Sequence, residues 1–421
     1  MKSYHKTRIR LLCMSMLLVI MCTMFAGCSG GDAQRELDSL AIVLGIALDK
    51  CDHLNEKSKE NTEKSRLMVT AQVVRTSSVK GGNSGGTDSA GNSADAAYWN
   101  VELECNDIFA MLRSAVHRTN RKLYISHNKI IIFGEELAQE GINPYIDFFL
   151  RDHETRYLVK MVIAEGRAGD ILYINSQLES LPAQDIEKLI EVQRMAAQAP
   201  TLTLFDYAIA ERSAFTASLF PIIKSEEALS DNEGPDHFLV TGSAVIDDGK
   251  MIGKLDEKQT RGFLWVMNQV QSTVLVIPVD REETTASIEV LKATGKTDIK
   301  LDTEGSEPVL RTKVAVDISG SIGHLTENIP LRDEAVMKLI AAHTEQEVRD
   351  EILDAFQKAR ELGSDIFGIS AYLSRHYPKQ WNTGLRENWQ ELYKNMKIEV
   401  QVTANLVRTG SLIESMTQIQ G

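Results

Sequence analysis

The sequence predicts an α+β protein, with a mixed α/β N-terminal domain and a C-terminal α+β domain built on a largely antiparallel sheet. Apolar residues make up 43% of the 421 residues and charged residues 25%, which is typical of a folded chain. Strand-like and helix-like segments alternate through residues 35–200, as they do in mixed α/β domains. Residues 273–421 instead show successive strands, then helices, then a returning strand, which favours an antiparallel sheet.

The N-terminus has the pattern of a lipoprotein signal peptide, residues 1–27. A positively charged segment comes first, with Lys2, Lys6, Arg8 and Arg10. The uncharged run that follows, residues 11–26, is shorter than the roughly 20 residues of a membrane-spanning helix and is typical of a signal peptide. The small residues Ala26 and Gly27 then precede Cys28, as in a lipobox. At a lipobox a diacylglyceryl group is attached to the cysteine thiol, and the signal peptide is then cleaved just before that cysteine. We expect a lipid on Cys28; an ordinary signal peptide is the alternative.

Residues 28–34 form a short polar tether that reaches only about 20 Å when extended. Two acyl chains would give the stable anchoring that a single chain lacks. Removal of residues 1–27 takes away four positive charges and no negative one, so the net charge falls from −13 to −17. An acidic chain of this kind argues against nucleic acid or anionic lipid headgroups as its main ligand.

Two of the five cysteines, Cys51 and Cys105, lie in the mature chain apart from the lipidated one. In an exported protein they either pair as a disulfide or stay free. The sequence has no CxxC motif and no pair spaced as a metal clip, so no metal site and no cofactor are expected.

The N-terminal domain, 35–200, begins with strands at 40–48 and 67–76. Residues 77–93 hold five Gly and five Ser, so we expect a flexible insertion there. A helix should follow with Asn106 as its cap and one apolar face made of Ile108, Phe109, Leu112 and Val116. Further strands are expected at 129–133 and 157–164, a helix at 135–150 broken near Gly141 and Pro144, and a helix around 171–172.

A middle domain, 201–272, contains a strand pair around Gly249. The C-terminal domain, 273–421, should have strands at 274–279, 288–292, 298–301 and 312–318 with Gly turns between them. The Thr344–Glu347 pattern indicates a capping box that opens a helix, which Gly363 would end. Residues 398–406 alternate apolar and polar side chains, which predicts a half-buried strand.

Residues Asp317, Ser319 and Ser321 have the D-x-S-x-S spacing of Mg²⁺-dependent adhesion sites. Their strand alternates apolar and polar residues, whereas the central parallel strand of such a site is apolar on both faces. We therefore expect a polar turn there and no metal. No nucleophile, base and oxyanion stabiliser come together in the sequence, so no catalytic residue is assigned and the protein is not expected to be an enzyme.

Several stretches, in order along nearly the whole mature chain, resemble the Ger(x)C family of spore germination lipoproteins, the C subunits of nutrient germinant receptors. They are residues 35–50, 126–138, 149–152, 164–168, 241–244, 253–262 and 364–368, with Tyr377-Pro378, Trp381 and Trp389. The chain departs from the family in having Ser29-Gly30, where members commonly have Trp-Asp after the lipidated cysteine. The insertion at 77–93 is also an addition.

The resemblance implies a three-domain lipoprotein on the outer face of the inner spore membrane. It implies a non-catalytic role in nutrient-triggered germination, together with a multispanning A-type subunit and a transporter-like B-type subunit. Cys28 is the one functional position that the resemblance carries over. The alternatives are a solute-binding lipoprotein of a transporter, which would show two doubly wound lobes, and an exported cell-wall hydrolase.

Overall fold

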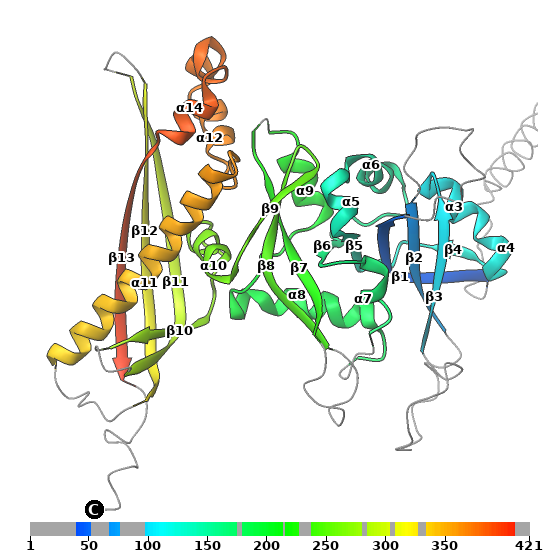
Figure 1. Ribbon diagram of the computed structural model, residues 1–421, viewed down its shortest axis with the longest axis horizontal. Helices are drawn as coiled ribbons and strands as arrows, with labels where there is room; N and C mark the ends of the chain where they lie inside the picture. Colours follow the sequence, from blue (N-terminus) through cyan, green and yellow to red (C-terminus); the bar gives the residue numbers. More distant parts are fainter. Residues whose placement is uncertain are drawn as a thin grey trace, which may run out of the picture. The chain divides into compact units, whose positions relative to one another are not determined.

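The computed structural model describes residues 39–51, 67–75, 97–174, 179–213, 215–226, 237–279, 284–303, 308–326 and 334–408 (Figure 1). The predicted signal peptide, the tether with Cys28 and the insertion at 77–93 lie outside these ranges. The α+β fold class is confirmed, because the described chain carries two sheets flanked by helices.

The first sheet has nine strands among the described residues. In chain order they are β1 (Leu40–Lys50), β2 (Leu67–Val74), β3 (Tyr98–Cys105), β4 (Lys122–Tyr124), β5 (Ile130–Gly134), β6 (Lys160–Ala164), β7 (Ser218–Glu226), β8 (His237–Asp247) and β9 (Lys250–Leu255). The sheet order is β3-β2-β1-β5-β6-β7-β8-β9, and β4 pairs with β1. Strands β1, β5, β6 and β7 are parallel neighbours, whereas the outer strands pair antiparallel.

The central strands of this sheet are apolar on both faces because helices cover them. Ile130–Phe133 of β5 is fully buried, which explains the unbroken apolar run in the sequence. Strands β7, β8 and β9 come from the predicted middle domain, yet they continue the same sheet. The sheet has no break at the predicted boundary between the N-terminal domain (35–200) and the middle domain (201–272). That boundary therefore stays a prediction.

Helices pack around the first sheet on short connections. They are α3 (Ile108–Ser114), α4 (Val116–Thr119), α5 (Glu135–Glu140), α6 (Asn143–Arg151), α7 (Ala168–Ile171), α8 (Pro182–Ala196) and α9 (Leu204–Ala210). The predicted break near Gly141 and Pro144 is confirmed, because α5 ends before Gly141 and α6 has its proline in the first turn.

Two details of α3 were predicted wrongly. Its cap is Asp107 rather than Asn106: the backbone of Asp107 is extended, and its carboxylate accepts the Phe109 N–H at 3.0 Å. Ile108 and Met111 are the buried residues of α3, while Phe109 is exposed. The helix has only two turns, so the spacing of its apolar residues was compatible with more than one inward face.

The second sheet has the order β10-β11-β12-β13. Its strands are β10 (Thr273–Pro278), β11 (Thr285–Asp302), β12 (Val309–Leu325) and β13 (Lys397–Arg408). The first three strands pair antiparallel and β13 pairs parallel with β12, so the largely antiparallel sheet is confirmed. Figure 1 shows β11 and β12 as a long hairpin beside the long helix α11 (Glu334–Glu361).

Strands at 288–292 and 298–301 with a Gly turn between them were a wrong prediction, because both segments belong to β11. Gly295 lies inside that strand, where its N–H donates to Asn268 Oδ1 at 2.7 Å. A Cβ on Gly295 would lie 2.4 Å from the Trp265 carbonyl oxygen. The glycine therefore permits a close backbone approach, which a sequence pattern does not distinguish from a turn.

The polar turn predicted at Asp317–Ser321 is also wrong. These residues lie inside β12 and pair with β11 on one side and β13 on the other. The expected alternation holds, since Val316 and Ile318 are buried whereas Asp317 is exposed. Asp317 and Ser319 face solvent on the outer side of the strand, whereas Ser321 is buried.

Thr344 does not open a helix, because α11 already runs from Glu334. The Thr344 hydroxyl donates to the Ile340 carbonyl oxygen at 2.8 Å, a bond made inside a helix. The end of the helix was predicted correctly: Gly363, with φ of +66°, follows it in the left-handed region.

Helix α10 (Glu257–Val266) crosses α11 at very short range. A Cβ on Gly262 would lie 2.0 Å from the carbonyl oxygen of Glu351 on α11. Beside this contact the buried Glu351 carboxylate accepts Arg261 Nε at 3.0 and 3.1 Å and Trp265 Nε1 at 2.9 Å. The crossing joins both helices to the core of the second sheet.

We expect Gly262→Ala to destabilise the protein by about 1–3 kcal/mol or more, since a methyl group would overlap the backbone of α11. Urea unfolding of the purified chain measures the change. Gly323→Ala is the control, because its Cβ meets only the Ser287 carbonyl oxygen at 3.7 Å. Equal stability of the two variants would contradict the close crossing.

Glu351→Ala should cost about 3–5 kcal/mol of unfolding free energy, because it leaves the Arg261 guanidinium buried without its counter-ion. The matched control is Glu347→Ala on the same helix. Its partner Lys258 is largely exposed, so the expected cost is about 0–1 kcal/mol. Similar midpoints for both variants in thermal or urea unfolding would show that the buried pair contributes little.

Candidate functional site

The position assigned from the sequence, Cys28, lies outside the described residues, so its surroundings are not seen. Cys51 and Cys105 are both free thiols, each partly buried. Burial raises the pKa of the Cys105 thiol to about 11, so this thiol is protonated at neutral pH.

A buried carboxylate, Asp49, lies at the carboxyl end of β1. Its two oxygens accept the N–H groups of Ala168 at 2.7 Å and Gly169 at 2.8 Å, at the start of α7. A Cβ on Gly134 would lie 2.2 Å from Asp49 Oδ1, so a glycine is required to make room for the carboxylate. Burial raises the pKa of Asp49, although the two N–H donors partly oppose this.

A second buried carboxylate, Asp365, joins the segment before α12 (Ile369–His376) to the first sheet. Its side chain accepts the N–H groups of Phe367 at 3.2 Å and Ser370 at 2.7 Å, and its backbone carbonyl accepts the Ala217 N–H at 3.0 Å. Next to it, Ser364 donates to Asp247 Oδ2 at 2.7 Å. Burial raises the pKa of Asp365 as well.

These carboxylates bond to backbone N–H groups, which is a structural role. Within the described ranges no group of three or more His, Cys, Asp or Glu side chains is arranged to hold a metal ion. In the same part of the chain, no helix is both long and apolar enough to cross a membrane.

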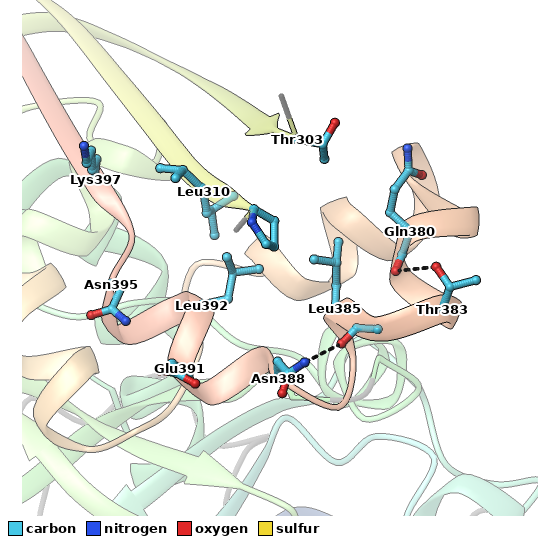
Figure 2. A pocket seen from close by; sticks show the side chains of 13 residues that line it. Thr303, Leu310, Gln380, Thr383, Leu385, Asn388, Glu391, Leu392, Asn395 and Lys397 are labelled. Atoms are coloured by element: carbon cyan, nitrogen blue, oxygen red, sulfur yellow. Dashed lines mark hydrogen bonds between the residues drawn. The ribbon is translucent and has the colours of Figure 1, made fainter. Parts of the chain in front are cut away.

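A groove of about 840 Å³ opens between the start of β12, the end of β11 and the helical segment 380–395. Figure 2 shows Leu310, Leu385 and Leu392 gathered at its centre. Polar side chains surround them: Thr303, Gln380, Thr383, Asn388, Glu391, Asn395 and Lys397. An apolar centre with a polar rim is typical of a binding surface.

The helical segment beside the groove is interrupted, which gives the groove its shape. Short helices α13 (Pro378–Gln380) and α14 (Trp389–Lys394) flank a π-helical turn, Trp381–Leu385. Gly384 departs from helical geometry there, and its carbonyl oxygen accepts Asn388 Nδ2 at 3.3 Å (Figure 2). The tryptophans of this segment, Trp381 and Trp389, are buried core residues.

The raised pKa of Asp49 gives a pH dependence with a definite sign. The folded chain binds a proton on Asp49 before the unfolded chain does, so the contribution of Asp49 to stability rises as the pH falls from its raised pKa towards 3.8. The unfolding free energy of the wild type minus that of Asp49→Asn should therefore grow over this window. Urea unfolding at a series of pH values measures it, and a difference that shrinks on acidification would contradict the raised pKa.

Comparison with known proteins gives two family matches that together cover most of the chain. Residues 33–225 match the model described as "Spore germination protein N-terminal domain". Residues 241–410 match the model described as "Spore germination B3/ GerAC like, C-terminal". The two models follow each other in chain order and include both sheets.

Individual relatives agree with these matches. The chain is 24% identical to spore germination protein KC of Bacillus subtilis (strain 168), over 94% of this chain and 95% of the relative. It is 22% identical to spore germination protein B3 of the same organism, over 69% of this chain and 75% of the relative. The crystal structure of the GerBC protein superposes with a TM-score of 0.52 at 16% identity, covering 83% of this chain and 96% of that chain, which supports the fold. The chain therefore belongs to the Ger(x)C family of GerAC-like spore germination proteins.

Proposed function

We propose that this protein is a non-catalytic, lipid-anchored subunit of a spore germinant receptor. It acts in nutrient-triggered germination by assembling with a multispanning A-type subunit and a transporter-like B-type subunit. Its attachment point is Cys28, on the outer face of the inner spore membrane. The observation that carries this proposal is the pair of family matches, which run in order through both sheets of the chain.

The fold and the site support a binding role. The buried carboxylates Asp49, Asp365 and Glu351 are each held by N–H or guanidinium donors. The groove of the second sheet offers an apolar centre with carboxamides and hydroxyls at its rim. Such a surface suits a segment of a partner subunit, which would bury leucines and hydrogen-bond at the rim.

A solute-binding lipoprotein has less support. That class has two doubly wound lobes, whereas the second sheet here has three antiparallel neighbours and one returning parallel strand. Calorimetry of the purified chain with nutrients separates the two functions, because tight binding of a small molecule without partners would favour the solute-binding protein.

Cys28→Ala tests the anchor. We expect the variant to lack the diacylglyceryl group and to keep residues 1–27, because lipid attachment precedes cleavage. Mass spectrometry of the N-terminal peptide from spore membranes measures this, and the rate of nutrient-triggered germination should fall. Cys51→Ala is the control, since that thiol is a free cysteine beyond the predicted signal peptide. An unmodified Cys28 in the wild type would refute the anchor.

Gly384→Phe tests the groove. A Cβ at Gly384 meets no atom within 4 Å, so a phenyl ring should fill the groove with little effect on stability. We expect lower recovery of the multispanning partners when the tagged chain is purified from detergent-extracted membranes.

Gly323→Phe is the matched control for this substitution, because it places the same ring at an exposed glycine near the other end of β12. Full recovery of partners with Gly384→Phe, at an unchanged unfolding midpoint, would show that the groove is not the contact surface.

A further inference from the structure

Four exposed apolar side chains lie on two adjoining segments beside the first sheet. One segment is the turn that precedes β6, and the other is helix α9. Leu158 is 75% exposed, Tyr157 49%, Phe205 50% and Ile209 52%. The segments adjoin directly, because the Phe205 N–H donates to the Tyr157 carbonyl oxygen at 2.9 Å. We call these four residues the amino-edge patch.

The orientation of α9 accounts for the exposure of two members. Leu204 and Tyr207 point inward and are fully buried, and the Tyr207 ring packs edge-on against Phe220. Phe205 and Ile209 are four residues apart, so they share the opposite, outward face of the helix. No described segment covers that face, since both side chains remain half exposed.

The strand register places the patch near the N-terminal ends of the parallel strands, which is also where the chain enters β1. Gly45 of β1, Ile130 of β5 and Lys160 of β6 lie side by side in parallel strands. Tyr157 comes three residues before Lys160, just as Ile42 comes three residues before Gly45. β1 and β6 are two strand spacings apart, about 10 Å. The patch is therefore close to the point from which the N-terminal segment leads away.

The length of that segment limits how far the patch can be from a membrane. Cys28 lies fourteen residues before Ile42, so a fully extended chain would span at most about 50 Å. A lipid on Cys28 thus keeps the amino edge of the sheet within about 50 Å of the bilayer surface. This step depends on the anchor in the proposed function.

The charges around the patch also suit a bilayer surface. Arg156 and Arg212 are exposed on the same two segments, although the chain as a whole is acidic. The nearby Asp206 carboxylate is engaged by the N–H of Thr203 at 3.1 Å and its hydroxyl at 2.7 Å. Aromatic and aliphatic side chains beside arginines match the boundary between lipid phosphates and acyl chains.

We propose that the amino-edge patch rests on the bilayer to which the chain is tethered. Tyr157, Leu158, Phe205 and Ile209 enter the interfacial region, and the two arginines lie over lipid phosphates. The lipid anchor and the patch then give two points of contact, so the first sheet is held in one orientation on the membrane.

A fluorophore at Leu158→Cys tests this proposal in the full chain carrying Cys51→Ser and Cys105→Ser. The chain is placed on phosphatidylcholine–phosphatidylglycerol vesicles that contain a headgroup-region nitroxide quencher. We expect quenching at position 158 to be several-fold stronger than at the control, Glu165→Cys. Glu165 is exposed and directly follows the opposite end of β6, one strand length further from the patch.

Equal quenching at both positions, or none at position 158, would overturn the proposal. Quenching at 158 that appears only with the other receptor subunits present would mean that a protein covers the patch, which also overturns it. The mass of the N-terminal peptide reports the anchor separately. A chain that lacks the lipid contradicts the proposed function alone. In that case the chain without residues 1–27, with a hexahistidine tag in place of Cys28, is bound to vesicles that contain a nickel-chelating lipid, so the label at position 158 still reports on the patch.

Discussion

The close crossing of α10 and α11 at Gly262 is the contact on which the C-terminal half of the structure depends. With no side chain at that position, the backbone of α10 approaches the Glu351 carbonyl oxygen, and Arg261 and Trp265 reach the Glu351 carboxylate. Helix α11 is thereby placed against the second sheet, where Ile352, Phe356 and other buried residues complete the core. An ion pair buried to this extent requires all of its donors, because a single missing partner leaves an uncompensated charge.

The same principle applies to the other buried acids. Asp49 joins the end of β1 to the start of α7, and Asp365 orders the residues that lead into α12. Each carboxylate accepts two backbone N–H groups that would otherwise be buried without partners. Burial raises the pKa of both groups, and the hydrogen bonds oppose this only in part. These acids are therefore best understood as connectors between elements distant in sequence.

Among the described residues, the two surfaces proposed for contacts with other molecules differ in chemistry. The groove between β12 and the segment 380–395 has a leucine centre and a rim of carboxamides and hydroxyls, which suits a protein partner. The amino-edge patch is an exposed aromatic and aliphatic surface flanked by arginines, which suits a bilayer. In the function proposed for this chain, the patch would set its orientation on the membrane and the groove would serve assembly with a partner subunit.

The sequence by itself determined the features that are encoded locally. Strands β1, β5 and β13 follow from apolar runs or strict alternation, the break at Gly141 follows from helix-ending residues, and the family follows from ordered blocks of residues. The lipid on Cys28 stays a prediction of the same local kind. The predictions were wrong where one local pattern is compatible with two structures. Gly295 was predicted in a turn but lies inside a strand, and Thr344 was predicted to cap a helix but lies inside one.

Only the tertiary structure decided which segments meet. Tyr157 and Phe205 are 48 residues apart in the sequence, yet a backbone hydrogen bond joins their segments at the edge of the sheet. The groove likewise combines Leu310 with Leu392, and Asp49 meets Ala168 across more than a hundred residues. Residue periodicity specifies the face of an element that is buried, but the partner of that face depends on strand order and on which backbones can approach closely. Those are properties of the whole packed chain.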